Sequence, residues 1–297
     1  MDKNYSGQIY VTPEKSICVS GLRSIYFDSL HWPQIRPSVS QYLTSRVFFK
    51  RQFVKEFILL DGHGSINYFH FLIDVVSKLW LLDQIPNSNK LPILINEKVF
   101  HLPYFQDFFS KNEMLKNRAL IIQSSNKPIV SNKVWLIKAL PFAQKNLTKM
   151  RSLGITSLKR DVSKKLFVNR KSTSNRHIFN SSELYYGISK MGFEEVFLED
   201  LPFLDQINLF HNASHIIAVH GAGLANMLFC KEDTCILELI PSNRIACQYY
   251  WLANALDFQN YSCVLGSDLV LNQQSKLLAF TVDPQIIEEI AQSWQSV

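Results

Sequence analysis

The sequence predicts an α/β protein with two lobes that share a cleft and are built on parallel sheets. Short hydrophobic, β-branched runs alternate with segments of helical period, which is the pattern of βαβ units. At 297 residues the chain is long for one compact domain and has the length of two domains of ordinary size. A polar, lysine- and arginine-rich stretch lies at residues 142–165, so we expect one domain over residues 1–150 and another over residues 151–297.

The first half becomes regular only after residue 50. Residues 54–60 predict a strand, a glycine-containing turn follows, and residues 67–85 predict a helix that Pro86 ends. Earlier residues show no strong period and remain unassigned. Three further strand-like runs occupy residues 91–95, 119–123 and 133–137.

The second half alternates strands and helices. Asn180 and Glu183 form a capping-box pattern that opens a helix ending near Gly192. The last predicted helix can pack on either lobe. In parallel sheets of this kind, ligands bind at the carboxyl ends of the strands. The predicted strands are residues 165–170, 196–200, 215–221 and 235–240, and the predicted helices are residues 180–192, 201–213, 224–230 and 283–297.

Composition narrows the class of protein. A net charge of +6 suits an anionic partner, although a basic soluble protein shows the same charge. No nucleic-acid-binding module is recognisable, so we expect no nucleic-acid partner. The five cysteines are scattered without a C-x-x-C pair, which argues against a disulfide framework and a structural zinc site. Because no signal-peptide pattern and no apolar run of membrane-spanning length occur, we expect a cytoplasmic protein.

The most informative segment is the end of the run HIIAVHGAG. An apolar strand stops at His220, and the chain turns through Gly221, Ala222 and Gly223 into a helical stretch. The small residues let a ligand approach the backbone, and the first N–H groups of a helix have no internal partner. We therefore expect the turn to bind an anionic oxygen, with plain packing of strand on helix as the alternative.

Basic and polar side chains follow at neighbouring strand ends. Arg170 and Lys171 end one predicted strand, and Arg176 lies shortly after them. These groups suit phosphate oxygens, although a solvated basic loop has the same composition. Asn226 follows the HGAG turn, and Glu238 at the next strand is placed to accept hydrogen bonds from ribose hydroxyls, unless it is an ordinary strand-edge carboxylate.

A second candidate site lies in the first half. His70 and Asp74 are four residues apart on one helical face, and His63 lies in the turn before them. A carboxylate beside an imidazole suits proton abstraction from a hydroxyl, and Asp74 is the first candidate base, ahead of His70 or His63. A surface ion pair is the alternative, but apolar and aromatic neighbours argue against free solvation.

Several other chemistries lack their motifs. The chain lacks the G-x-S-x-G motif of α/β-hydrolases, the G-x-x-x-x-G-K-[ST] phosphate-binding loop and the H-E-x-x-H motif of zinc proteases. It also lacks the motifs of protein kinases. The GHGSIN turn has Asn67 where a dinucleotide fingerprint has its third glycine. No D-x-D pair is present to hold a metal against a diphosphate, so we expect neither a metal nor a bound cofactor.

Three segments in order resemble glycosyltransferase family 61: NYFHFLID at residues 67–74, LFVNRKSTSNR at residues 166–176, and residues 201–229. The resemblance implies two Rossmann-like domains of the GT-B type and metal-independent, inverting transfer from a nucleotide sugar. Arg170, Lys171 and the turn at residues 220–223 would hold the donor, while His70 and Asp74 would face the acceptor.

The expected reaction moves a sugar from a nucleotide-sugar donor to a glycan or glycolipid acceptor. A UDP-sugar is the donor that we favour. The resemblance suggests a bacterial enzyme of capsule or lipopolysaccharide synthesis in the cytoplasm, with peripheral association with the inner membrane left open. The alternative is a subunit that binds the nucleotide sugar without turnover.

Overall fold

The computed structural model divides the chain into two compact units, Met1–Thr156 and Ser157–Val297. None of its described helices is long and apolar enough to cross a membrane. The structure describes residues 3–11, 18–20, 24–25, 51–62, 64–112, 114–124, 127–137, 142–154, 162–172, 175–269 and 279–294.

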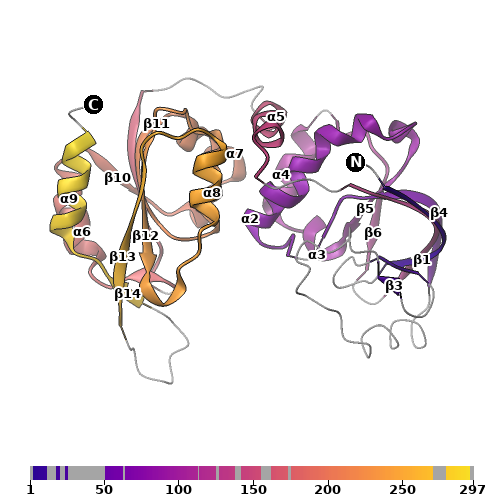
Figure 1. Ribbon diagram of the computed structural model, residues 1–297, viewed down its shortest axis with the longest axis horizontal. Coiled ribbons are helices and arrows are strands. Elements are labelled where there is room, and N and C mark those ends of the chain that lie inside the picture. Colours follow the sequence, from indigo (N-terminus) through magenta and orange to yellow (C-terminus); the bar gives the residue numbers. More distant parts are fainter. Residues whose placement is uncertain are drawn as a thin grey trace. The chain divides into compact units, whose positions relative to one another are not determined.

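Unit 1 is built on a seven-stranded sheet of order β3-β2-β1-β7-β4-β5-β6 (Figure 1). β4 is parallel to β7 and β5, and β5 is parallel to β6, as predicted. β1 to β3 add an antiparallel edge from the region that the sequence left unassigned. The strands are β1 (Lys3–Val11), β2 (Cys18–Ser20), β3 (Ser24–Ile25), β4 (Gln52–Leu59), β5 (Ile93–Asn96), β6 (Leu120–Gln123) and β7 (Ile129–Leu136).

The helix predicted over residues 67–85 forms as three consecutive helical segments. α2 (Tyr68–His70) begins at Asn67, whose side chain accepts a hydrogen bond from the Phe69 amide. A π-helical turn, η2 (Phe71–Val75), and a 3₁₀ segment, η3 (Val76–Gln84), follow, and the helical run ends just before Pro86. The other helical segments of unit 1 are η4 (Ser88–Lys90), α3 (Glu97–Phe100), α4 (Pro103–Lys111) and α5 (Gln144–Gly154).

Unit 2 carries a second seven-stranded sheet, of order β10-β8-β11-β12-β13-β14-β9. The five strands from β10 to β13 are parallel, and β14 adds an antiparallel strand. The α/β class with parallel sheets is thus confirmed. The strands are β8 (Lys164–Val168), β9 (His177–Ile178), β10 (Phe193–Val196), β11 (Ala213–Val219), β12 (Cys235–Pro241), β13 (Tyr261–Leu269) and β14 (Ala279–Thr281).

Helices cover both faces of this sheet. α6 and α9 lie on one face, and α7 and α8 lie on the other (Figure 1). Ile287 and Ala291 of α9 join Leu184 and Ile188 of α6 in one buried cluster, so the last helix packs within unit 2. The helical segments are α6 (Ser181–Ser189), η5 (Leu198–Asp200), α7 (Phe203–His211), η6 (Ala222–Phe229), η7 (Ser242–Arg244), α8 (Gln248–Ala255) and α9 (Pro284–Ser293).

The strand order creates a topological switch point between β8 and β11. From β8 the chain goes through α6 to β10 on one side, and it returns through α7 to β11 on the other side of β8. In open α/β sheets, ligands bind at the carboxyl ends of the strands where the connections diverge. The residues that follow β8 and β11 therefore occupy the preferred ligand position of this fold.

Two local predictions were wrong. The strand expected at residues 196–200 is β10 at Phe193–Val196, and residues 198–200 form η5. Asn180 does not cap α6, because its side chain instead bonds the backbone oxygen and nitrogen of Val282 at 2.8 and 3.2 Å. The helix predicted after the HGAG turn is present as the 3₁₀ helix η6.

Candidate functional site

The first candidate site begins where β4 ends. Asp61 is buried, and its Oδ1 accepts a hydrogen bond from the Gly62 amide at 2.7 Å while its Oδ2 accepts one from the Asn96 amide at 3.1 Å. The Ser65 hydroxyl donates to the Gly62 carbonyl at 2.6 Å. These bonds tie the turn after β4 to the end of β5, at the carboxyl edge of the parallel strands.

Gly64 allows this turn to pass close to the His70 ring. Its φ of +96° lies in the region that favours glycine, and a Cβ there would lie 3.1 Å from Cδ2 of His70. A side chain at this position would therefore strain the backbone and crowd the imidazole. His63, the third candidate base, lies outside the described residues.

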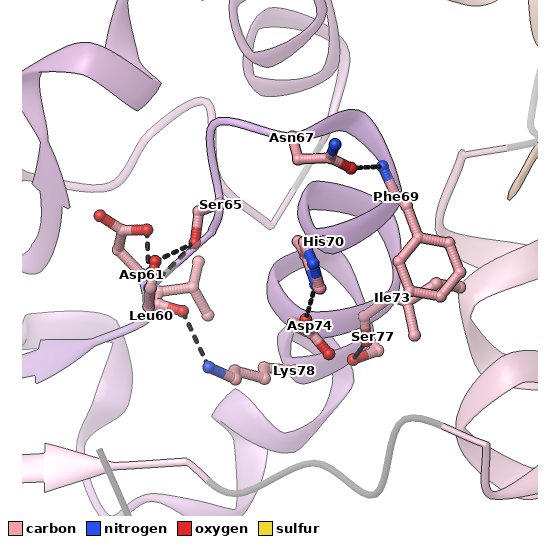
Figure 2. A network of polar contacts seen from close by, with 11 residues as sticks. Leu60, Asp61, Ser65, Asn67, Phe69, His70, Ile73, Asp74, Ser77 and Lys78 are labelled. Atoms are coloured by element: carbon pink, nitrogen blue, oxygen red, sulfur yellow. Dashed lines mark hydrogen bonds and ion pairs between the residues drawn. The ribbon is translucent and has the colours of Figure 1, made fainter. Parts of the chain in front are cut away.

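His70 and Asp74 form the expected pair. Nδ1 of His70 lies 2.7 Å from Oδ2 of Asp74, and the dashed line in Figure 2 marks this contact. The side chain of Asp74 is 9% exposed, whereas that of His70 is 23% exposed. The pair is thus not a freely solvated surface ion pair. The Asp74 carboxylate thus engages Nδ1 of the imidazole.

Lys78 joins this network, although sequence patterns did not single it out. Its Nζ donates to the Leu60 carbonyl at 3.2 Å, and the residue is 5% exposed (Figure 2). Burial lowers the pKa of Lys78 to about 8, against the opposing effect of the negative charges of Asp74 and Asp61. The sequence does contain a signal for Lys78: His70, Asp74 and Lys78 are each four residues apart, which is the spacing of residues on one face of a helix.

The second candidate site lies at the switch point of unit 2. Gly221 packs against Arg170 so closely that a Cβ on Gly221 would lie 2.3 Å from Nη1 of the guanidinium. Burial lowers the pKa of Arg170, and the negative charge of Glu199 opposes the shift. Within the described residues, the buried Nε of Arg170 has no hydrogen-bond partner. A buried donor of this kind is positioned for an anionic ligand.

A buried pair supports the other side of this turn. Nδ1 of His220 lies 2.5 Å from Oε1 of Glu238, and the two side chains are 3% and 1% exposed. The Tyr261 hydroxyl donates to the other oxygen of Glu238. Burial, reinforced by the charge of Glu238, raises the pKa of Tyr261, so this hydroxyl stays a donor. Glu238 thus orients His220, and both of its oxygens are engaged by protein groups.

α8 holds the backbone of the turn. The Tyr249 hydroxyl donates to the Gly221 carbonyl at 2.5 Å, and its ring lies edge-on to His220 with centroids 5.4 Å apart. Burial raises the pKa of Tyr249. Nε2 of Gln248 lies 3.4 Å from Nε2 of His220. Sequence reasoning missed these residues because α8 follows β12 without any motif that points back to residues 220–223.

The remaining predicted donor-site residues take varied positions. Lys171 forms an exposed ion pair with Asp200 at 2.5 Å, and this bond raises the pKa of Lys171. Arg176 has a φ of +66°, and its positive charge opposes the rise that burial causes in the pKa of Tyr249. Asn226 is fully buried and donates to Gln206 at 3.1 Å, so it joins η6 to α7.

The two small residues between Gly221 and Leu224 remain partly exposed. Ala222 and Gly223 are intermediate in burial, and a Cβ on Gly223 would lie 2.5 Å from Cδ1 of Leu198. Gly223 therefore lets η6 approach η5. Among the residues that the structure describes, no group of three or more His, Cys, Asp or Glu side chains is arranged to hold a metal ion.

Known proteins resemble parts of this chain. A 72-residue segment is 39% identical to protein O-linked-mannose beta-1,4-N-acetylglucosaminyltransferase 2 of Canis lupus familiaris, over 23% of this chain and 12% of that enzyme. A 74-residue segment is 36% identical to the EGF domain-specific O-linked N-acetylglucosamine transferase of Bos taurus, over 23% of this chain and 14% of that enzyme. The matches thus cover a small part of the length of these curated relatives.

Among solved structures, a flavodiiron core from Synechocystis sp. PCC6803 aligns with a TM-score of 0.31 and 10% identity, over 58% of this chain and 44% of that one. The model of the family Glycosyltransferase 61 matches residues 68–237, a span that includes His70, Asp74, Arg170 and the HGAG turn. Because this match covers more than half of the sequence, the chain belongs to the Glycosyltransferase 61 family.

Proposed function

We propose that the protein transfers a sugar from a nucleotide-sugar donor to a hydroxyl of a glycan or lipid-linked glycan. A UDP-sugar is the donor that we favour. The observation that carries the proposal is the contact of the Arg170 guanidinium with Gly221 at the switch point of unit 2. Family membership and the names of the two relatives support the reaction class.

On the donor side, Arg170 and the backbone of the HGAG turn receive the diphosphate. A guanidinium that is partly removed from water binds phosphate more strongly than one in bulk solvent, because the local dielectric constant is lower. His220, the first residue of this turn, is held at Nδ1 by the Glu238 carboxylate and lies at Nε2 against Gln248. These groups stabilise the negative charge that develops on the leaving nucleotide, each well-placed donor contributing about 3 kcal/mol. No step in this scheme requires a metal ion.

On the acceptor side, His70 is the base and Asp74 orients it. The sequence ranks Asp74 first, but its carboxylate is the more buried member of the pair and is already bonded to Nδ1 of His70. His70 exposes more surface, and its Nε2 accepts the acceptor's hydroxyl proton as the oxygen attacks the anomeric carbon. A single displacement of this kind inverts that carbon.

We place the reaction in bacterial surface polysaccharide synthesis, in the cytoplasm and in peripheral contact with the inner membrane, with the two units in a GT-B-type arrangement. The net charge of +6 favours approach to an anionic lipid surface. The relatives' names make N-acetylglucosamine the first sugar to test.

The competing function is a subunit that binds the nucleotide sugar without turnover. It would use the same groups of unit 2 but would leave the His70–Asp74 pair without a role. Product formation from a panel of donors and acceptors separates the two functions.

The first experiment screens UDP, GDP, CMP and their sugars by thermal shift, because a ligand that binds the folded state raises its melting temperature. The stabilising donor is then incubated with glycan acceptors, in buffer with and without EDTA, and the product's anomeric configuration is read by NMR. Arg170→Ala should abolish the thermal shift, while Lys190→Ala, which removes an exposed charge in the same unit, should retain it. A full shift with Arg170→Ala would overturn the donor assignment.

A further inference from the structure

Phe69 and His70 lie where the helical run of unit 1 emerges from the core. Tyr68, Phe69 and His70 keep part of their surface exposed, whereas every residue from Phe71 to Leu79 is buried. A substrate that reaches the imidazole therefore comes close to these first residues. Two of the three are aromatic, although the proposed reaction assigns no role to an aromatic ring.

The two aromatic rings have different surroundings. Tyr68 lies edge-on to Tyr104 of α4, with ring centroids 5.3 Å apart, and the Tyr104 hydroxyl donates to the Ile66 carbonyl at 2.7 Å. Phe69 lies beside the imidazole: its ring centroid is 5.4 Å from that of His70, and the two ring planes meet at 85° (Figure 2). Tyr68 thus helps to join α2 to α4, and Phe69 is the aromatic side chain next to the proposed base.

The nearly perpendicular rings of Phe69 and His70 form a corner with one apolar wall and one polar wall. A pyranose has the same two-sided character, because its ring C–H groups make apolar faces while its hydroxyl groups point outward from the ring edge. The C–H face packs on a phenyl ring and removes apolar surface from water. A hydroxyl at the edge is then left for the polar wall, so the corner fits a sugar ring.

We propose that Phe69 is a specificity-determining residue of the acceptor site: its ring packs on the C–H face of the acceptor's sugar, whose hydroxyl then lies at His70. This inference rests on the proposed function, in which His70 takes the proton of that hydroxyl. The occupant of the corner is a sugar ring, rather than a peptide side chain or a lipid tail. Loss of the phenyl ring should weaken acceptor binding and leave donor binding to unit 2 unchanged.

A binding experiment that needs no turnover comes first. Saturation-transfer NMR is recorded with methyl β-glucoside, β-galactoside, α-mannoside and N-acetyl-β-glucosaminide as probes. At least one probe should receive saturation on its ring C–H protons from the wild-type protein. Phe69→Leu, which keeps an apolar side chain without an aromatic ring, should reduce that signal severalfold, whereas Phe69→Tyr keeps the ring and should keep the signal. Phe53→Leu is the matched control, because Phe53 is 61% exposed near the start of β4, at the end of the strand opposite the candidate site.

Kinetics with the donor and acceptor that the screen identifies test the same role in the reaction. Phe69→Leu should raise the acceptor KM roughly tenfold, equivalent to about 1.4 kcal/mol, with kcat and the donor affinity little changed. The retained kcat separates this role from a structural one, because a disturbed helix would misplace His70 and lower kcat.

Two results of the NMR experiment would overturn the proposal. One is that none of the glycosides receives saturation from the wild-type protein. The other is that Phe69→Leu, shown to be folded by its thermal unfolding curve, binds them as the wild type does; if it does not fold, Phe69→Met is the second ring-free variant. If no donor and acceptor pair yields product, the proposed function fails, while NMR still decides whether Phe69 binds a sugar. If product forms and the acceptor KM of Phe69→Leu is unchanged, the role of Phe69 alone is rejected.

Discussion

Arg170 and Gly221 are in contact across the switch point of unit 2, where the ends of β8 and β11 diverge. Gly221 is extended, with a φ of 178°, so any residue fits its backbone there. Glycine is needed for space alone, because a Cβ would lie 2.3 Å from Nη1 of Arg170. The contact joins two motifs that are about fifty residues apart in the chain and makes one cationic site of them.

Gly221→Ala should displace the Arg170 guanidinium and weaken nucleotide binding by roughly tenfold, which corresponds to a change of about 1.4 kcal/mol. The melting temperature should change little, since the backbone accepts alanine. Isothermal titration calorimetry with the nucleotide measures the affinity, and a thermal unfolding scan measures the melting temperature. The control is Gly187→Ala, where a Cβ meets the end of the Glu288 side chain. Unaltered affinity in Gly221→Ala would show that Arg170 does not need this contact to bind phosphate.

Glu238→Gln should leave His220 without its carboxylate partner and weaken donor binding by roughly tenfold or more. The variant also lowers the free energy of unfolding, because the carboxylate is buried between His220 and Tyr261. Tyr261→Phe removes only the second bond and should retain most of the affinity. Equal affinity losses in the two variants would indicate that Glu238 acts through packing rather than through His220.

Asp74→Asn should reduce kcat by roughly a hundredfold or more while the donor affinity stays unchanged, because the imidazole loses its orienting carboxylate. Steady-state kinetics with a calorimetric measurement of nucleotide binding separate the two effects. If the nucleotide affinity falls with kcat, Asp74 has a structural role instead.

The stability of the protein should depend on Lys78 in alkaline solution. The pKa of Lys78 falls from 10.5 to about 8 on folding, so between these values the unfolded chain binds more protons than the folded one. The free energy of unfolding therefore rises with pH through this window, by at most roughly 3 kcal/mol.

Urea unfolding at pH 7.5 to 10 measures this dependence. Lys78→Met should lose the rise, and the difference between the two curves removes the effect of groups such as Tyr104, whose pKa is raised to about 12 by burial. Identical pH dependence in both proteins would mean that Lys78 stays charged in the folded state throughout the window.

Most strands follow from the sequence, because buried parallel strands are continuous hydrophobic runs. β12 is buried along its whole length, and its alternation places Glu238 on the face opposite Leu237 and Leu239. The spacing of His70 and Asp74 likewise predicts their contact, since residues four apart share a helical face. Helix ends are less predictable, as Asn180 shows: its amide finds Val282, more than a hundred residues away, in place of its own helix.

The sequence by itself determined the α/β class and the short motifs around His70, Arg170 and His220, because periodicity and local spacing act over a few residues. Only the tertiary structure decided which charges meet. Lys78 reaches the Leu60 carbonyl, Tyr249 reaches Gly221, and Glu238 reaches His220 through pairing of distant strands and the packing of helices on them. The energy of a buried charge depends on such neighbours in space, and no local pattern records them.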